Sequence, residues 1–246
     1  MPEPSERSAG ADSAEMFNHT RWSLVAAVRD GAHGSDRNPL EELSGSYWFP
    51  VYACIRRHGH APAAAHRLAG RFFAELAEQI RQQAPAGFGR FRVFLFDRLQ
   101  RFLAGTVDAR TAAVDDGLTP EIEALEQRLA IEHIGSSGPD ATFERSFGLQ
   151  VLTRSRERLA EETRRSERGD MFARLAPFLT VEPPVGAIPR LAADLGIGTL
   201  AVQVAIKRLR QRFRDLVEAE LAETVTSPAE LEAERAALLR ALSGTP

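Results

Sequence analysis

The sequence is poor in the residue types on which disulfides, metal clusters and membrane spans depend. It has one cysteine, Cys54, among 246 residues, which excludes an internal disulfide and leaves too few thiolates for a zinc ribbon or an iron–sulfur cluster. Its apolar stretches, such as residues 24–28, are far shorter than the roughly 20 residues of a membrane-spanning helix. The first residues are polar and contain no apolar segment of a signal peptide. We therefore expect a cytoplasmic protein that does not associate with membranes.

Signatures of catalytic and nucleotide-binding sites are also missing. The sequence contains no glycine-rich phosphate loop, no Gly-x-Ser-x-Gly turn and no His-Glu-x-x-His pair. His58, His60 and His66 lie near one another in the chain, but no acidic residue lies close enough in sequence to complete a metal site. Cys54 lies on an apolar flank, which favours a packed side chain over a nucleophile. We predict no enzymatic activity, no metal, no cofactor and no small-molecule substrate.

Charge is distributed unevenly, although the net charge is only −3. Residues 21–110 contain 13 arginines and 8 acidic residues, residues 115–132 contain six acidic residues and one arginine, and residues 199–214 contain five basic residues and no acidic one. This pattern is typical of a chain of which only a part meets a polyanion.

Hydrophobic residues recur at helical spacing nearly throughout, and no segment alternates with the period of a strand. We predict an all-α protein with two helical domains joined by an acidic linker. The predicted parts are a disordered N-terminus (residues 1–18), a helical domain (19–106), the linker (107–139), a second helical domain (140–226) and a tail helix (227–246). Residues 115–132 should be mobile, because they offer little apolar surface to offset the entropy of ordering.

Residues 187–217 have the pattern of a helix-turn-helix. Pro189 lies in the first turn of the first helix, and Gly196 ends that helix. Apolar residues then recur at spacings of four, three, four and three along the second helix, at Val202, Ile206, Leu209, Phe213 and Leu216. The other faces of this helix carry polar and basic residues, namely Thr199, Gln203, Lys207, Arg208, Arg210, Arg212 and Arg214.

The second helix of this pattern allows two interpretations. In a helix-turn-helix, Thr199 and Gln203 would face base edges, while the basic residues nearer the end of the helix would contact phosphates. The same spacing is typical of an amphipathic surface helix with a solvated basic face. Spacing alone does not decide between them.

Six ordered motifs resemble those of a known family. They are TRWSLV at residues 20–25, YWFPVY at 47–52, IRRHG at 55–59, RFFAEL at 71–76, GRFRVFL at 89–95 and AVQVAIKRLR at 201–210. Together they resemble the extracytoplasmic-function type of bacterial RNA polymerase sigma factor, and in particular the variants common in planctomycetes. The resemblance covers residues 20–102 and 143–226.

The resemblance implies a transcription initiation factor without catalysis. In that family the N-terminal helical domain binds the polymerase clamp and the −10 promoter element, and the C-terminal domain binds the flap and reads the −35 element through its helix-turn-helix. It implies further DNA contacts on the helix at residues 91–103, from Arg92, Arg98 and Arg101. It implies polymerase contacts from His66, Arg67, Arg71, Phe72 and Phe73, and it allows an anti-sigma or other regulatory protein as a further partner.

Two segments depart from the family pattern. Residues 63–71 read AAAHRLAGR where the family has acidic residues and a glutamine that meet the basic clamp. Residues 104–110 read AGTVDAR where the family continues with a basic, promoter-contacting run. The first hypothesis is a sigma-like transcription initiation factor that binds core RNA polymerase and promoter DNA. The alternatives are a diverged sigma-like DNA-binding regulator or adaptor that has lost clamp binding, and a structural protein whose helices bind a protein partner.

Overall fold

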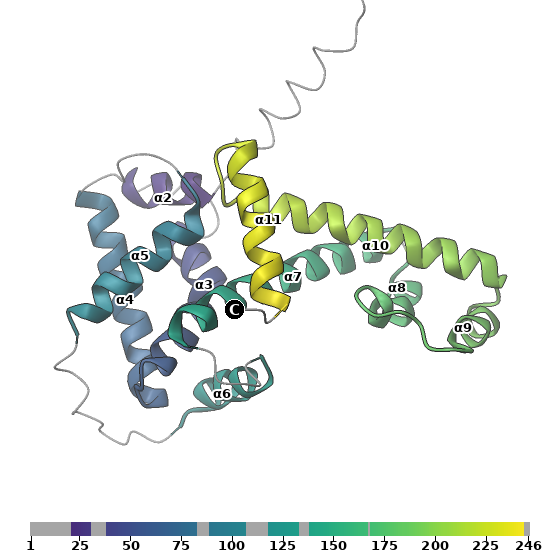
Figure 1. The fold of residues 1–246 in the computed structure, drawn as a ribbon, viewed down its shortest axis with the longest axis horizontal. Helices are drawn as coiled ribbons and strands as arrows, with labels where there is room; N and C mark the ends of the chain where they lie inside the picture. Colours follow the sequence, from purple (N-terminus) through teal and green to yellow (C-terminus); the bar gives the residue numbers. More distant parts are fainter. Residues whose placement is uncertain are drawn as a thin grey trace, which may run out of the picture. The chain divides into compact units, whose positions relative to one another are not determined.

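The computed structural model describes residues 21–30, 38–82, 89–106, 118–132, 138–166 and 168–243, and residues 1–18, predicted to be disordered, lie outside these ranges. Within the ranges every regular element is helical and no strand is present (Figure 1), which confirms the predicted all-α class. The helices are α2 (Arg21–Asp30), α3 (Pro39–Arg57), α4 (Pro62–Gln82), α5 (Phe91–Ala104), α6 (Pro120–Glu132), α7 (Pro139–Arg165), α8 (Gly169–Leu175), the 3₁₀ turn η2 (Ala176–Phe178), α9 (Ala187–Leu195), α10 (Thr199–Ala222) and α11 (Pro228–Ser243). None of these described helices is long and apolar enough to cross a lipid bilayer.

The chain forms two compact units. Unit 1 comprises Met1–Gln150 and Leu221–Pro246, and unit 2 comprises Val151–Glu220. The divisions fall inside α7 and α10, whereas the sequence predicts boundaries in the segments before and after residues 140–226. The difference arises because the start of α7 and all of α11 supply buried side chains to unit 1.

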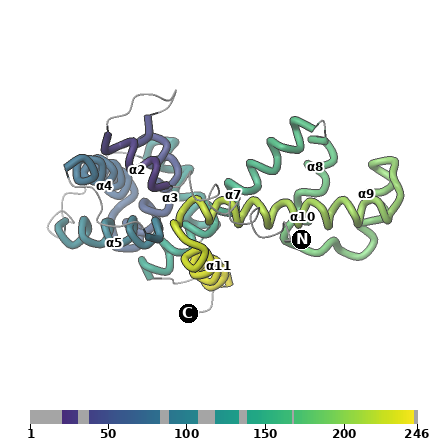
Figure 2. The backbone as a smooth tube through the Cα atoms, turned by 90° about the horizontal axis from the view of Figure 1, so that it is seen from above, coloured from purple at the N-terminus to yellow at the C-terminus, as the bar shows by residue number. Residues whose placement is uncertain are grey.

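Helices α2, α3 and α4 pack against one another in unit 1 (Figure 2). Apolar side chains of α3 and α4 are buried there, with Val51 and Ile55 of α3 and Leu76 of α4 among those excluded from solvent. Trp22 of α2 is buried as well, and its indole N–H donates to the carbonyl of Gly89 at 2.7 Å, just before α5 begins. Aromatic burial and this hydrogen bond fix α2 against the start of α5.

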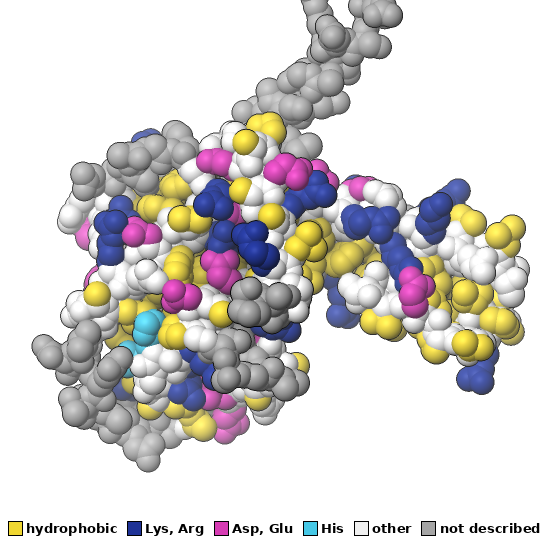
Figure 3. All heavy atoms as spheres, viewed as in Figure 1, with side chains coloured by type: hydrophobic (Ala, Val, Ile, Leu, Met, Phe, Trp, Pro, Cys, Tyr) yellow, Lys and Arg dark blue, Asp and Glu magenta, His cyan; other side chains and the backbone are white. Residues whose placement is uncertain are grey.

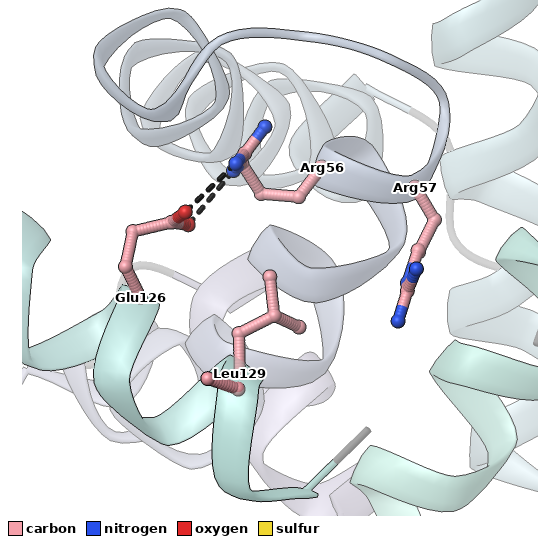
Figure 4. A pocket seen from close by; sticks show the side chains of 5 residues that line it. Arg56, Arg57, Glu126 and Leu129 are labelled. Atoms are coloured by element: carbon pink, nitrogen blue, oxygen red, sulfur yellow. Dashed lines mark hydrogen bonds and ion pairs between the residues drawn. The ribbon is translucent and has the colours of Figure 1, made fainter. Parts of the chain in front are cut away.

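Helix α6 lies in the segment predicted to be a mobile linker, but it is docked in unit 1. Its Glu126 accepts hydrogen bonds from Arg56 Nε and Nη2 on α3, both at 2.7 Å, and from the Tyr52 hydroxyl at 2.6 Å. Figure 4 shows Arg56 and Glu126 pointing toward one another beside a pocket of about 260 Å³. Arg128 of α6 also lies over the ring of Phe49, 3.9 Å from its centroid. These contacts correct the expectation of mobility for residues 118–132.

Glu126→Gln is expected to reduce the stability of unit 1 in a pH-dependent way. Hydrogen bonding from Arg56 holds the pKa of Glu126 below its usual value of 4.5. The ionised carboxylate therefore stabilises the folded chain above about pH 4.5, and this contribution is lost as the pH falls through the lower folded-state pKa. Urea titrations should find the variant less stable than wild type by about 1 kcal/mol at pH 7, with a difference that shrinks as the pH falls below 4.5. Glu123→Gln, at an exposed position of the same helix, is the control, and equal pH profiles for the two variants would refute this role of Glu126.

Helix α11 is an integral part of unit 1. The carboxylate of its Glu234, only 1% exposed, accepts hydrogen bonds from Arg92 Nε at 2.8 Å and Arg92 Nη2 at 3.0 Å on α5. On α7, a Cβ added to Gly148 would lie 2.9 Å from Cδ1 of Leu238, so α7 and α11 approach closely at this glycine. The predicted tail helix thus exists, and it contributes a buried charge and apolar contacts to the unit.

Candidate nucleic-acid interface

Helices α9 and α10 of unit 2 are joined by a three-residue turn, residues 196–198. Gly196 ends α9, as the sequence predicts, in a left-handed conformation with φ 66° that favours glycine. Its N–H donates to the carbonyl of Ala193, and the N–H of Ile197 donates to that of Ala192 at 3.0 Å. These bonds satisfy the last carbonyls of α9. The carbonyl of Gly198 then accepts the N–H of Val202 and begins α10.

One face of α10 is buried along its whole length in unit 2. Val202 and Ile206 pack with Leu175 of α8 and Ala192 of α9 in one apolar cluster. Farther along, Phe213 and Leu216 pack with residues of α7 and of the segment after η2 in a second cluster, which contains Leu159 and Leu179. The stripe predicted from the sequence therefore faces the core and fixes which residues of α10 reach the surface.

The outward face near the start of α10 is mixed in character. Thr199, Gln203 and Lys207 are exposed there, in agreement with their predicted positions. Leu200 and Val204 are also on this face, with exposed fractions of 71% and 40%. Both are apolar and lie off the buried stripe, so their exposure could have been predicted from the sequence.

Two of the five basic residues of α10 have partners within unit 2. Arg210 donates to the carbonyls of Phe178 and Val181, at 2.9 and 2.8 Å, and to Glu182 at 2.6 Å. Arg212 forms a bidentate pair with Glu162 of α7, at 2.8 and 2.6 Å. Arg210 therefore anchors the chain after η2, and its contact with DNA stays a prediction. Arg212 stays half-exposed, and its hydrogen bonds lower the pKa of Glu162.

The other three basic residues of α10 remain open to solvent. Lys207, Arg208 and Arg214 are exposed, and none of them forms an ion pair with a described residue. Arg214 donates to the Gln211 side chain at 2.7 Å, which leaves its charge uncompensated. Their positive charges make this part of the α10 surface able to attract a polyanion.

Two grooves flank α10 within unit 2. One groove, of about 430 Å³, lies between α10 and the segment before α9. Its lining includes Gln203, Lys207 and Arg214 of α10. The other, of about 610 Å³, is lined by apolar side chains, among them Phe172 and Leu209, and by charged side chains such as Arg208. Figure 3 shows basic and hydrophobic side chains side by side on the surface of this unit. The surface therefore combines positive charge with apolar recesses.

Comparison with known proteins does not assign this surface to a family. No protein-family model, curated protein or solved structure matches the chain. The function is therefore inferred from the geometry of the described residues and from the sequence motifs.

The three arginines predicted to contact DNA from α5 have different environments. Arg92 is only 8% exposed, and it is paired with Glu234 and also with Glu144 of α7. The prediction that Arg92 contacts DNA is therefore corrected, because its donors are used inside the protein. Arg98 is partly exposed and lies over the ring of Phe94, 5.4 Å from its centroid. Arg101 is exposed and pairs with Asp97 one turn earlier.

Phe72 and Phe73 of α4, which the resemblance assigns to polymerase binding, are core residues. Both are buried. The Phe72 ring packs edge-on against Phe102 of α5, and the Phe73 ring stacks on Trp48 of α3. This corrects their predicted role, since neither ring is open to a partner. They hold α4 against α3 and α5 instead.

The three basic residues predicted to meet polymerase lie at or near the surface of α4. Arg67 and Arg71 are exposed, and Arg71 pairs with Glu75 at 3.3 Å. His66 is half-buried beside Trp48, and its Nε2 lies 3.4 Å from a carboxylate oxygen of Glu121 on α6. The acidic partners were not foreseen from residues 63–71, and they offset part of the positive charge of this segment.

The remaining candidates for chemistry do not form a reactive site. Among the described residues no three His, Cys, Asp or Glu side chains are grouped so that they could hold a metal ion. Cys54 is fully buried, and burial raises the pKa of its thiol to about 12. The thiol is therefore protonated at neutral pH and packs as a small apolar side chain.

Proposed function

We propose that this protein is a sigma-like transcription initiation factor that binds promoter DNA through a helix-turn-helix formed by α9 and α10, and that recruits core RNA polymerase. The observation that carries the proposal is the orientation of α10. Its apolar stripe is buried against α8 and α9, so Thr199, Gln203 and the unpaired basic residues face outward together. An α-helix presented in this way fits the major groove of duplex DNA.

The polymerase part of the proposal is supported by the ordered motifs and by one surface. The apolar groove of unit 2 has a size and character that suit an amphipathic helix, as in the flap contact of the family that the motifs resemble.

DNA binding is tested by salt dependence with a fluorescent duplex of random sequence and the full-length chain. Lys207, Arg208 and Arg214 should displace about three counterions, so affinity should fall at least tenfold between about 50 and 200 mM salt. Lys207→Ala should reduce the slope of log K against log salt by about 0.9. Arg212→Ala is the matched control with a smaller effect, because Glu162 already compensates its charge. Affinity that stays constant across this range would refute the proposal.

A DNA-binding regulator or adaptor without clamp binding is the second candidate. It is favoured by the burial of Phe72 and Phe73 and by the positive charge of Arg67 and Arg71, which a basic clamp would repel. Affinity purification of the tagged full-length chain from its host separates the two candidates. Recovery of core polymerase subunits supports the initiation factor, and salt-sensitive DNA binding without polymerase supports the regulator.

A further inference from the structure

Two apolar side chains on the outward face of α10 have no role in the core. Leu200 and Val204 are 71% and 40% exposed, although Val202 between them is fully buried. Residues four apart lie on the same side of a helix, separated by about 6 Å along its axis. This distance is close to two base-pair steps, at about 3.4 Å each.

The residues around this pair indicate what covers it. Thr199 and Gln203 adjoin the two apolar side chains, and Lys207 follows one turn later without an ion-pair partner among the described residues. A protein groove that receives an apolar helix face would leave this lysine and these polar groups buried and unpaired. The major groove of DNA instead offers base-edge donors and acceptors and phosphates, and its one apolar group is the C5-methyl of thymine.

We infer that Leu200 and Val204 contact thymine methyl groups in the major groove and so set a preference for thymine at two nearby positions of the bound site. The inference rests on the proposed DNA binding, and it adds which bases are read and by which residues. Gln203, between the two contacts, remains the residue placed to hydrogen-bond a base edge.

The test uses duplexes selected from a random library by the full-length chain. Each thymine of a selected duplex is then replaced by deoxyuridine, which lacks only the C5-methyl group. Loss of one buried methyl should weaken binding about fourfold at each of two positions and have little effect elsewhere. In Leu200→Ala one of these two effects should disappear, and in Val204→Ala the other. Val185→Ala, at a fully exposed valine before α9, should keep both.

The outcomes separate the two levels of the proposal. Salt-sensitive binding that is indifferent to uridine at every position, or selection that yields no preferred sequence, overturns the thymine inference and leaves DNA binding intact. In that event, capture of a protein by the wild-type chain but not by Leu200→Ala would assign the apolar pair to a protein partner. Absence of salt-sensitive binding to any duplex overturns the inference and the proposed function together.

Discussion

Replacing Glu234 by alanine is expected to lower the free energy of unfolding of unit 1 by about 3–5 kcal/mol. The carboxylate forms two hydrogen bonds with Arg92, and both side chains are almost completely buried. Without Glu234, the Arg92 guanidinium stays in the interior with only the partly exposed Glu144 as a partner. A buried charge that loses its main partner costs more than the intact pair contributes.

Urea unfolding of the full-length chain measures this effect, and α11 supplies its own control. Glu232→Ala removes an exposed carboxylate on the same helix, which pairs with Arg235 three residues later. Its effect should stay below about 0.5 kcal/mol. Changing Arg92 to Met together with Glu234 to Leu should recover much of the loss, because it replaces the pair by apolar side chains. Equal effects of the two single variants would show that Arg92 is solvated and not buried.

Val202→Asp is expected to unfold unit 2 and to abolish the proposed DNA binding. Val202 is fully buried in the cluster that joins α8, α9 and α10. An unpaired carboxylate at this position costs several kcal/mol, which is comparable to the whole stability of a unit of this size. The α9–α10 pair would lose its shape, since this cluster holds α9 against α10.

Hydrogen exchange followed by mass spectrometry locates the effect. Peptides from α8, α9 and the first half of α10 should lose protection in Val202→Asp, and peptides from α3 and α4 should keep it. Val204→Asp introduces the same side chain two residues later at an exposed position and should leave all these peptides protected. Protection of α9 that survives Val202→Asp would mean that this cluster does not hold the pair together.

Local patterns in the sequence predicted the helices and the face of α10, because both depend on neighbours within a few residues. The buried stripe from Val202 to Leu216 has the period of a helix, and Gly196 is the residue type that a left-handed helix end requires. Each of these features depends on a short stretch of sequence. It can be predicted without knowing which helices pack against that stretch.

Side chains whose partners are distant in sequence were misjudged. The residues next to Arg92 in the sequence are typical of a surface arginine, but its partner Glu234 lies 142 positions away. Glu126 lies in an acidic stretch that composition alone marks as mobile, yet Arg56, 70 positions earlier, binds its carboxylate. Arg210 is bound by backbone carbonyls that no sequence pattern identifies. For each of these three side chains, a contact with a residue distant in sequence decides its environment, and the neighbouring residues do not reveal that contact.

The position of α11 in the chain affects the order in which the protein can fold during synthesis. Unit 1 needs Glu234 for Arg92, and this glutamate is translated after every residue of unit 2. The ribosome therefore synthesises all of Val151–Glu220 while α5 still has an incomplete interior. Domains generally fold as their segments emerge. Here the unit that begins first is completed last, and Arg92 lacks its main counter-charge until α11 has been made.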